Sequence, residues 1–268
     1  GGAHAGDHHG GAERAAGDPH PMSAQPKDVS APLAEPKQAA AEVLAGRPGP
    51  TARRWIGPTT LVVFVLFAID TYLVVRYKVL PGDVPILRFV NQFNWGPLVY
   101  PMNWIDASAG IWQVLLGAVA VVAMFILERR AGWLMAIGSI SSLLDNIIKL
   151  VITRQRPPGD IVRILSPTTG YSYPSGHAVF FTWMAFMLAV AIAPKIRPGY
   201  RPVLWIFAAI VIVLTCIERV WAGAHYPSDV LGGALLGIGW SAFVLWLPER
   251  WLPSPSFRWF RGRARATS

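Results

Sequence analysis

Long apolar stretches without a charged residue dominate most of this 268-residue sequence. The clearest are 178–193, 203–217 and 230–247, and 111–127 has Gln113 as its only strongly polar side chain. A bilayer core of ~30 Å is crossed by a helix of ~20 apolar residues, and these stretches with their flanks reach that length. The sequence therefore predicts a membrane protein, in agreement with 53% apolar and only 15% charged residues.

Six helical spans are expected, and the predicted fold class is an all-α, integral-membrane six-helix bundle formed by residues 53–250. The spans lie near 59–79, 109–128, 131–151, 176–194, 202–219 and 228–247. Asp70 in the first span and several polar residues in the third are expected to face the interior of the bundle rather than lipid. Residues 80–108 contain four prolines, so they are expected to form a loop with a short interfacial helix near 86–93.

The two ends of the chain differ from the spans in composition. Residues 1–52 are rich in Ala, Gly, Pro and His, and such a segment buries too little apolar surface to fold, so a disordered cytoplasmic tail is predicted. Four of the six histidines lie in it; they could bind metal, but a solvated tract is the preferred interpretation. Residues 251–268 are expected to form a basic cytoplasmic tail.

The net charge of +9 is interpreted as membrane anchoring rather than nucleic-acid binding. Twelve Lys and Arg residues lie on one side of the predicted spans and eight on the other, and three of those eight belong to the motifs described next. Basic residues accumulate on the cytoplasmic side. The sequence thus predicts a multi-pass protein of the inner or plasma membrane with both termini cytoplasmic and the 152–175 and 220–228 loops outside.

Three polar motifs stand at the predicted outer ends of the spans. The first is Lys149 followed seven residues later by Arg156-Pro157, and if the helix continues the two cations share one face. The second is Pro-Ser-Gly-His, ending at His177. The third runs from Arg219 through His225 to Asp229.

These residue types are the ones that phosphoryl transfer needs. Lys and Arg neutralise the non-bridging oxygens, and a helix start such as that at Ser175 binds anions. One histidine can attack phosphorus, a carboxylate can fix its tautomer, and a second histidine can protonate the leaving oxygen. Outside the tail, His177 and His225 are the two histidines available, and Asp229 lies four residues after the latter.

The pattern K-x6-R-P, P-S-G-H and R-x5-H-x3-D resembles the signature of the type-2 phosphatidic acid phosphatase family, whose site is similar to that of vanadium haloperoxidases. The resemblance covers roughly residues 59–247 and implies that His225 is the nucleophile, Asp229 orients it and His177 is the general acid. It implies no metal or other cofactor. The implied phosphate-binding residues are Lys149, Arg156, Ser175, Gly176 and Arg219.

Several residues near the motifs have more than one interpretation. The family commonly has Ser where this chain has Glu218, and an acid there repels substrate if it points inward. Asp145 either pairs with Lys149 four residues on or is simply an interior polar residue. Asp70 is expected to have a structural or a coupling role, and Cys216 is expected to contribute to packing. Arg154 and Arg163 could add to the positive field, although a solvated loop is the preferred interpretation.

The predicted function is a membrane phosphatase acting on a lipid phosphate or diphosphate of the isoprenyl diphosphate, phosphatidate or phosphatidylglycerophosphate type. Isoprenyl diphosphate is placed first because three cations exceed what one phosphate monoester requires. A lipid phosphotransferase using the same site is the alternative. A haloperoxidase fits six spans poorly, and a lipid transporter would favour symmetric broken spans that are absent from the sequence. The sequence does not determine an oligomeric state.

Overall fold

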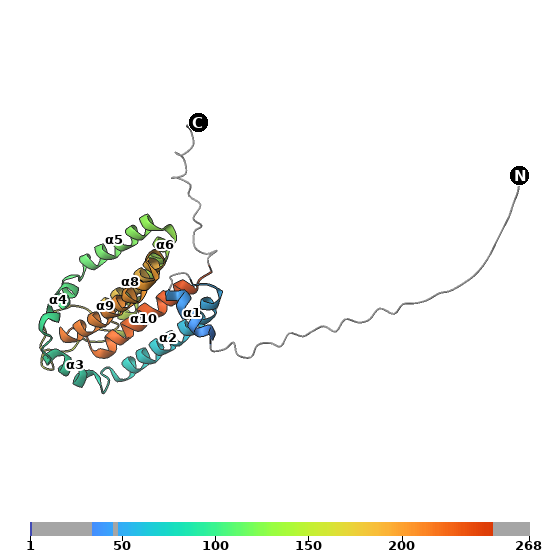
Figure 1. Cartoon of the computed structure of the whole chain (residues 1–268). Coiled ribbons are helices and arrows are strands. Elements are labelled where there is room, and N and C mark those ends of the chain that lie inside the picture. Colours follow the sequence, from blue (N-terminus) through green and yellow to red (C-terminus); the bar gives the residue numbers. More distant parts are fainter. Residues whose placement is uncertain (2–33, 45–47, 249–268) are drawn as a thin grey trace.

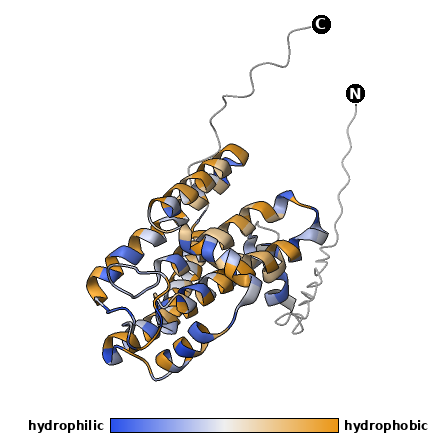
Figure 2. Cartoon of the chain, turned by 90° about the vertical axis from the view of Figure 1, so that its left-hand side faces the viewer, coloured by the Kyte–Doolittle hydropathy of each residue, from blue (hydrophilic) through white to orange (hydrophobic). Residues whose placement is uncertain are grey.

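The computed structural model describes residue 1, residues 34–44 and residues 48–248. Within these ranges every regular element is a helix and no strand occurs, which confirms the all-α membrane fold predicted from the sequence. Hydrophobic residues predominate along the long helices, and hydrophilic residues gather in the segments that connect them (Figure 2). The predicted C-terminal tail 251–268 lies outside the described residues.

Five stretches of the described chain are long and apolar enough to cross a membrane. Four of the helices that form them are α2 (Pro50–Tyr77), α8 (Gly176–Ile192), α9 (Arg201–Trp221) and α10 (Pro227–Trp246). The fifth stretch consists of α6 (Arg129–Gly138) followed by α7 (Ile140–Ile152). The break between them falls at Ser139, where the hydroxyls of Ser139 and Ser141 bond back to carbonyls three residues earlier, a pattern that bends helices.

The remaining predicted span corresponds to α5 (Ile111–Leu127), which has 17 residues and therefore rises only about 25 Å. It counts as a sixth span together with Gly96–Ala107, from which it is bent by 87°. This preceding part contains α4 (Val99–Ala107) in a region predicted to be mainly loop. Pro101 does not prevent the helix because it lies in the first turn of α4, where an amide hydrogen has no helical partner to lose. The predicted interfacial helix is α3 (Asp83–Gln92).

Part of the predicted disordered tail is helical. Helix α1 (Ala34–Leu44) packs beside α2, and the Glu42 carboxylate accepts a 2.8 Å hydrogen bond from the Ala52 amide at the start of α2. The alanine-rich sequence of α1 favours a helix, and the first span begins at Pro50 rather than near residue 59. Residues 2–33 and 45–47 of the predicted tail lie outside the described residues, and the four histidines of the tail fall within 2–33.

Helix α8 is the centre of the bundle and is buried on nearly all sides, with α9 and α10 packed against it (Figure 1). Two glycines of α10 allow this close packing. A Cβ at Gly233 would lie 2.6 Å from the Ser175 carbonyl oxygen, and one at Gly237 would lie 2.8 Å from Thr182 Cβ. Helices α2, α5 and α9 instead expose many large apolar side chains, as expected of surfaces that face lipid.

The starts of α8 and α10 and the ends of α7 and α9 meet at one end of the bundle, which we call the motif end. Helices α3 and α4 also lie at this end (Figure 1). All three sequence motifs therefore occupy the same end, as the predicted topology requires.

Candidate active site

Backbone hydrogen bonds join the second motif to the third and shape the third motif at the motif end. The Ser175 amide donates to the Asp229 carbonyl at 2.9 Å, which joins the start of α8 to the start of α10. The Arg219 carbonyl, near the end of α9, accepts from the amides of Ala224 and His225 at 3.2 and 3.3 Å. Gly223 adopts φ +70°, and a Cβ there would meet the Arg163 carbonyl, so the turn before His225 requires glycine.

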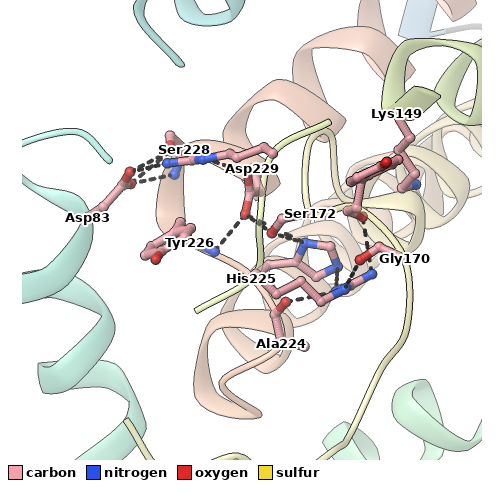
Figure 3. A network of polar contacts seen from close by, with 12 residues as sticks. Asp83, Lys149, Gly170, Ser172, Ala224, His225, Tyr226, Ser228 and Asp229 are labelled. Carbon is pink, nitrogen blue, oxygen red and sulfur yellow. Dashed lines mark hydrogen bonds and ion pairs between the residues drawn. The ribbon is translucent and has the colours of Figure 1, made fainter. Parts of the chain in front are cut away.

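His225 lies in the short connection between α9 and α10 and is almost fully buried. Its Nδ1 is 3.7 Å from Asp229 Oδ2 and 3.4 Å from the Ser172 hydroxyl, and its Nε2 is 3.1 Å from Arg156 Nη1 (Figure 3). Burial lowers the pKa of His225 to about 4, and the charge of Arg156 acts in the same direction, while Asp229 opposes the shift. The ring is therefore neutral at neutral pH.

The Asp229 carboxylate is fully buried and bonded through both oxygens. Oδ2 accepts from the Ser172 hydroxyl at 2.5 Å and from the Tyr226 amide at 2.8 Å, which also caps α10. Oδ1 accepts from Arg154 Nη1 at 2.5 Å (Figure 3). These donors stabilise the ionised carboxylate and fix its orientation toward the imidazole.

Arg154 is not the solvated loop residue that the sequence suggested, because its side chain is only 2% exposed. It bridges Asp229 and Asp83, with Nη2 donating to Asp83 Oδ2 at 2.6 Å, and its guanidinium lies over the Tyr226 ring at 4.5 Å. Asp83, from α3, also accepts from the amide and hydroxyl of Ser228 in the first turn of α10. A buried chain of contacts thus connects α3 to the candidate nucleophile.

Arg156 reaches His225 from a loop rather than from the helix face proposed above. Helix α7 ends at Ile152, and Thr153 takes a left-handed conformation with φ 51°, so the helix does not continue to Arg156. The guanidinium donates to the carbonyls of Ala224 and Gly170 at 2.8 and 3.0 Å. Among the described residues no carboxylate lies within ion-pair distance of it, so its charge remains available to an anion.

Lys149, in the last turn of α7, pairs with Asp145 one helical turn earlier. This is the first of the two interpretations of Asp145 given above. Its Nζ lies 2.6 and 2.5 Å from the two carboxylate oxygens. The pair lies against the start of α8, because a Cβ at Gly176 would be 2.9 Å from Asp145 Oδ2 and 3.0 Å from Lys149 Nζ. The glycine at position 176 in the second motif therefore leaves room for the Lys149–Asp145 pair beside the start of α8.

Arg219 is buried between two carboxylates. Glu218 turns back onto its neighbour and bonds both Arg219 Nε and Nη2, so the acid that departs from the family pattern is paired. Asp106, from the end of α4, forms a second ion pair with Arg219 Nη2 and accepts a 2.7 Å hydrogen bond from the Ser166 hydroxyl.

His177 and Ser175 contribute buried polar atoms that have no hydrogen-bond partner in the described part of the chain, His177 Nε2 and Ser175 Oγ. Both stand at the start of α8. Arg219 and His225 are within electrostatic range of the His177 ring. Unsatisfied buried groups are costly, so these two atoms are candidates for contact with a polar ligand.

Asp70 lies outside this cluster and has a structural contact. It accepts a 2.9 Å hydrogen bond from the Tyr173 hydroxyl, which also contacts Thr71 Oγ1 at 2.8 Å. The contact ties α2 to the loop immediately before α8. Cys216 is free and partly buried in α9, next to the cluster around Leu87.

Sequence reasoning missed five residues of this site: Asp83, Asp106, Ser166, Ser172 and Ser228. One signal was available, because residues 80–108 and 152–175 contain only three acids, and two of them, Asp83 and Asp106, are the ones that pair with the site arginines. The serines carry no comparable signal.

Comparisons with known proteins agree with the motifs. Residues 129–253, which include all three motifs, match the PAP2 superfamily. The chain is 28% identical over 188 residues to the undecaprenyl-diphosphatase of Sulfolobus acidocaldarius, an alignment covering 69% of this chain and 86% of that protein. It is 32% identical over 170 residues to the bacitracin transport permease protein BcrC of Bacillus licheniformis, covering 61% and 79% respectively.

The fold also has a solved counterpart. The crystal structure of a transmembrane PAP2 type phosphatidylglycerolphosphate phosphatase from Bacillus subtilis superposes with a TM-score of 0.58 at 24% identity, over 69% of this chain and 93% of that one. At this identity the likeness concerns the fold.

Proposed function

The chain belongs to the PAP2 superfamily and is a membrane-embedded lipid phosphatase, and we propose that it cleaves a lipid phosphate or diphosphate by forming a phosphohistidine on His225. The orientation of His225 is the observation that carries the proposal. Its Nδ1 faces Asp229 and Ser172, while Nε2 faces Arg156. With the proton on Nδ1, the lone pair of Nε2 points to the place where a cation attracts the phosphoryl group.

In the first step, Nε2 of His225 attacks phosphorus, and the bond to the leaving oxygen breaks. His177 protonates that oxygen, so the lipid alcohol or lipid monophosphate departs neutral or singly protonated. Asp229 stabilises the imidazolium that forms. The oxygens of the transferred group are held by Lys149, Arg156, Ser175, Gly176 and Arg219.

In the second step, water attacks the phosphohistidine while His177 accepts its proton, and inorganic phosphate leaves as the P–N bond breaks. The positively charged side chains neutralise the charge on the equatorial oxygens in both steps, so the proposal assigns no step to a metal ion. Activity is therefore expected to survive chelators, and vanadate, which mimics five-coordinate phosphorus, is expected to inhibit.

The lipid nature of the substrate is supported by the position of the site at the ends of the membrane helices. A lipid presents its phosphate at that depth while its chain stays in the bilayer. Lys149 and Arg219 are each paired with a carboxylate, so the number of cations does not by itself favour a diphosphate over a monophosphate. Isoprenyl diphosphate is placed first because the Sulfolobus relative is named an undecaprenyl-diphosphatase.

The test is turnover by purified protein in mixed micelles. Long-chain isoprenyl diphosphate, a matched long-chain lipid monophosphate and a short soluble ester are compared at equal subsaturating concentration, with His225→Ala and with His20→Ala as a histidine control. We expect lipid turnover in wild type and His20→Ala, a radiolabelled acid-labile adduct in quenched wild type, and neither in His225→Ala. Faster turnover of the soluble ester, or an active His225→Ala protein, contradicts the proposal.

The two alternatives give different results in the same assay. A phosphotransferase would pass the labelled phosphate to an added acceptor alcohol in preference to water. A transporter, the function that the name of the Bacillus licheniformis relative suggests, would release no phosphate at all.

A further inference from the structure

Asp106 occupies a position on Arg219 that the phosphatase reaction needs. Arg219 is one of the phosphate-binding residues proposed above, yet its Nε and Nη2 both donate to carboxylates, from Glu218 and from Asp106, and among the described contacts only Nη1 has no carboxylate partner. Two carboxylates on one guanidinium leave no net positive charge for a phosphate oxygen. Binding of a phosphate oxygen at Arg219 Nη2 therefore requires that one acid give way.

Exposure distinguishes the two acids. The Glu218 side chain is fully buried, and moving it away from Arg219 would leave a buried charge unpaired, which is costly. The Asp106 side chain is 35% exposed, whereas Arg219 is 1% exposed. Asp106 can therefore turn away from Arg219 without becoming a fully buried, unpaired charge, so it is the exchangeable partner.

The surroundings of Asp106 place it on Arg219 without burying it. Asp106 is the next-to-last residue of α4, a helix outside the buried core of α8 and α10. Its second partner is the Ser166 hydroxyl, on a loop held by hydrogen bonds from the amides of Leu165 and Ser166 to the Ala222 carbonyl. A fixed loop thus presents a hydrogen bond that keeps Asp106 on Arg219.

We propose that Asp106 is a specificity-determining residue that competes with phosphate oxygens for Arg219, so that an oxygen of substrate or product reaches Arg219 Nη2 only by displacing it. The inference rests on the proposed function. Its consequence is weak retention of small phosphate ions, which have only their charge to offer. A lipid phosphate adds the binding of its apolar chain and displaces Asp106 more readily, so the acid favours lipid substrates over free phosphate.

The test is the inhibition constant of vanadate and of inorganic phosphate for Asp106→Asn. Removing the carboxylate that competes with the anion for Arg219 is expected to lower both constants by ~10-fold, to lower KM for the lipid, and to reduce kcat through slower product release. Asp160→Asn removes the same charge from an exposed position of the neighbouring loop and is the matched control, with constants expected within twofold of wild type.

A second variant keeps every charge in place. Ser166→Ala removes the hydrogen bond that holds Asp106, so it is expected to lower the vanadate constant by ~2- to 3-fold, the worth of a modest hydrogen bond. This variant decides the question if Asp106→Asn does not fold.

An unchanged or raised inhibition constant in a folded Asp106→Asn protein overturns the inference, because an acid that merely orients Arg219 would weaken anion binding when removed. Failure of the proposed function has a different signature. In that case the wild-type protein itself would release no phosphate from lipid, or Arg219→Ala would bind vanadate as wild type does.

Discussion

Replacing Arg154 with methionine probes the buried contacts that orient the candidate nucleophile. The guanidinium lies between Asp83 and Asp229, and the side chains of all three residues are at most 2% exposed. Methionine fills much of the arginine volume but leaves two buried carboxylates without their shared cation. Removing one partner of a buried ion pair typically costs ~3–5 kcal/mol, and solvent screening is slight at this burial.

The expected loss has two measurable consequences. In a domain of this size, a loss of ~1 kcal/mol lowers Tm by ~2–4 °C. The Tm measured in detergent is therefore expected to fall by ~6–20 °C. Asp229 also loses the donor to its Oδ1, and with it part of the orientation of His225, so kcat is expected to fall by ~100-fold in the protein that remains folded.

Arg163→Met is the control, because this arginine has an exposed side chain in the same loop and its replacement is expected to change stability by less than ~0.5 kcal/mol. Arg154→Lys preserves the charge but lacks the fork that reaches both acids, so an intermediate Tm is expected. If Arg154→Met melts and turns over as Arg163→Met does, the buried network neither supports the fold nor positions His225.

Three further outcomes are expected. Gly176→Ala should lower kcat/KM by ~10–100-fold, because its Cβ would lie 3.0 Å from Lys149 Nζ and displace that cation. Because the pKa of His225 is lowered to about 4 from 6.5, only the unfolded state gains this proton as pH falls through that range. The unfolding free energy should therefore decrease between pH 6.5 and pH 4. This decrease should be larger in wild type than in His225→Gln by ~3 kcal/mol. Single cysteines at Thr168 and Arg263, in a background without the native cysteine, should label from opposite sides of the membrane, with Thr168 reached from outside intact cells.

Each of these outcomes has a control. Gly199→Ala, where an added Cβ meets nothing within 4 Å, should retain wild-type kcat/KM. Equal pH dependence of unfolding in wild type and His225→Gln would show that burial does not hold the imidazole neutral. Labelling of both cysteines from one side would refute the proposed orientation.

The amino-acid sequence by itself determined the membrane class, the helical fold and the three motifs. These are local properties: a 20-residue apolar run spans a bilayer wherever it occurs, and a charge beside such a run is expensive enough to indicate function. The Lys149–Asp145 pair was likewise within reach of sequence, because four residues separate its members on one helix. The break at Ser139 and helix α4 could not be predicted from the sequence. Both depend on whether a single turn of backbone hydrogen bonds forms at that place.

The tertiary structure alone decided which acids complete the site. Asp83 meets Arg154 across 71 residues of sequence, and Asp106 meets Arg219 across 113. Neither acid belongs to a motif, and their meeting follows from where α3 and α4 pack at the motif end. The same packing buries Arg154, although its position in a loop had suggested a solvated side chain. It also turns Glu218 onto Arg219. The charge available to a phosphate is a sum over neighbours in space, and those neighbours are fixed only when the helices assemble.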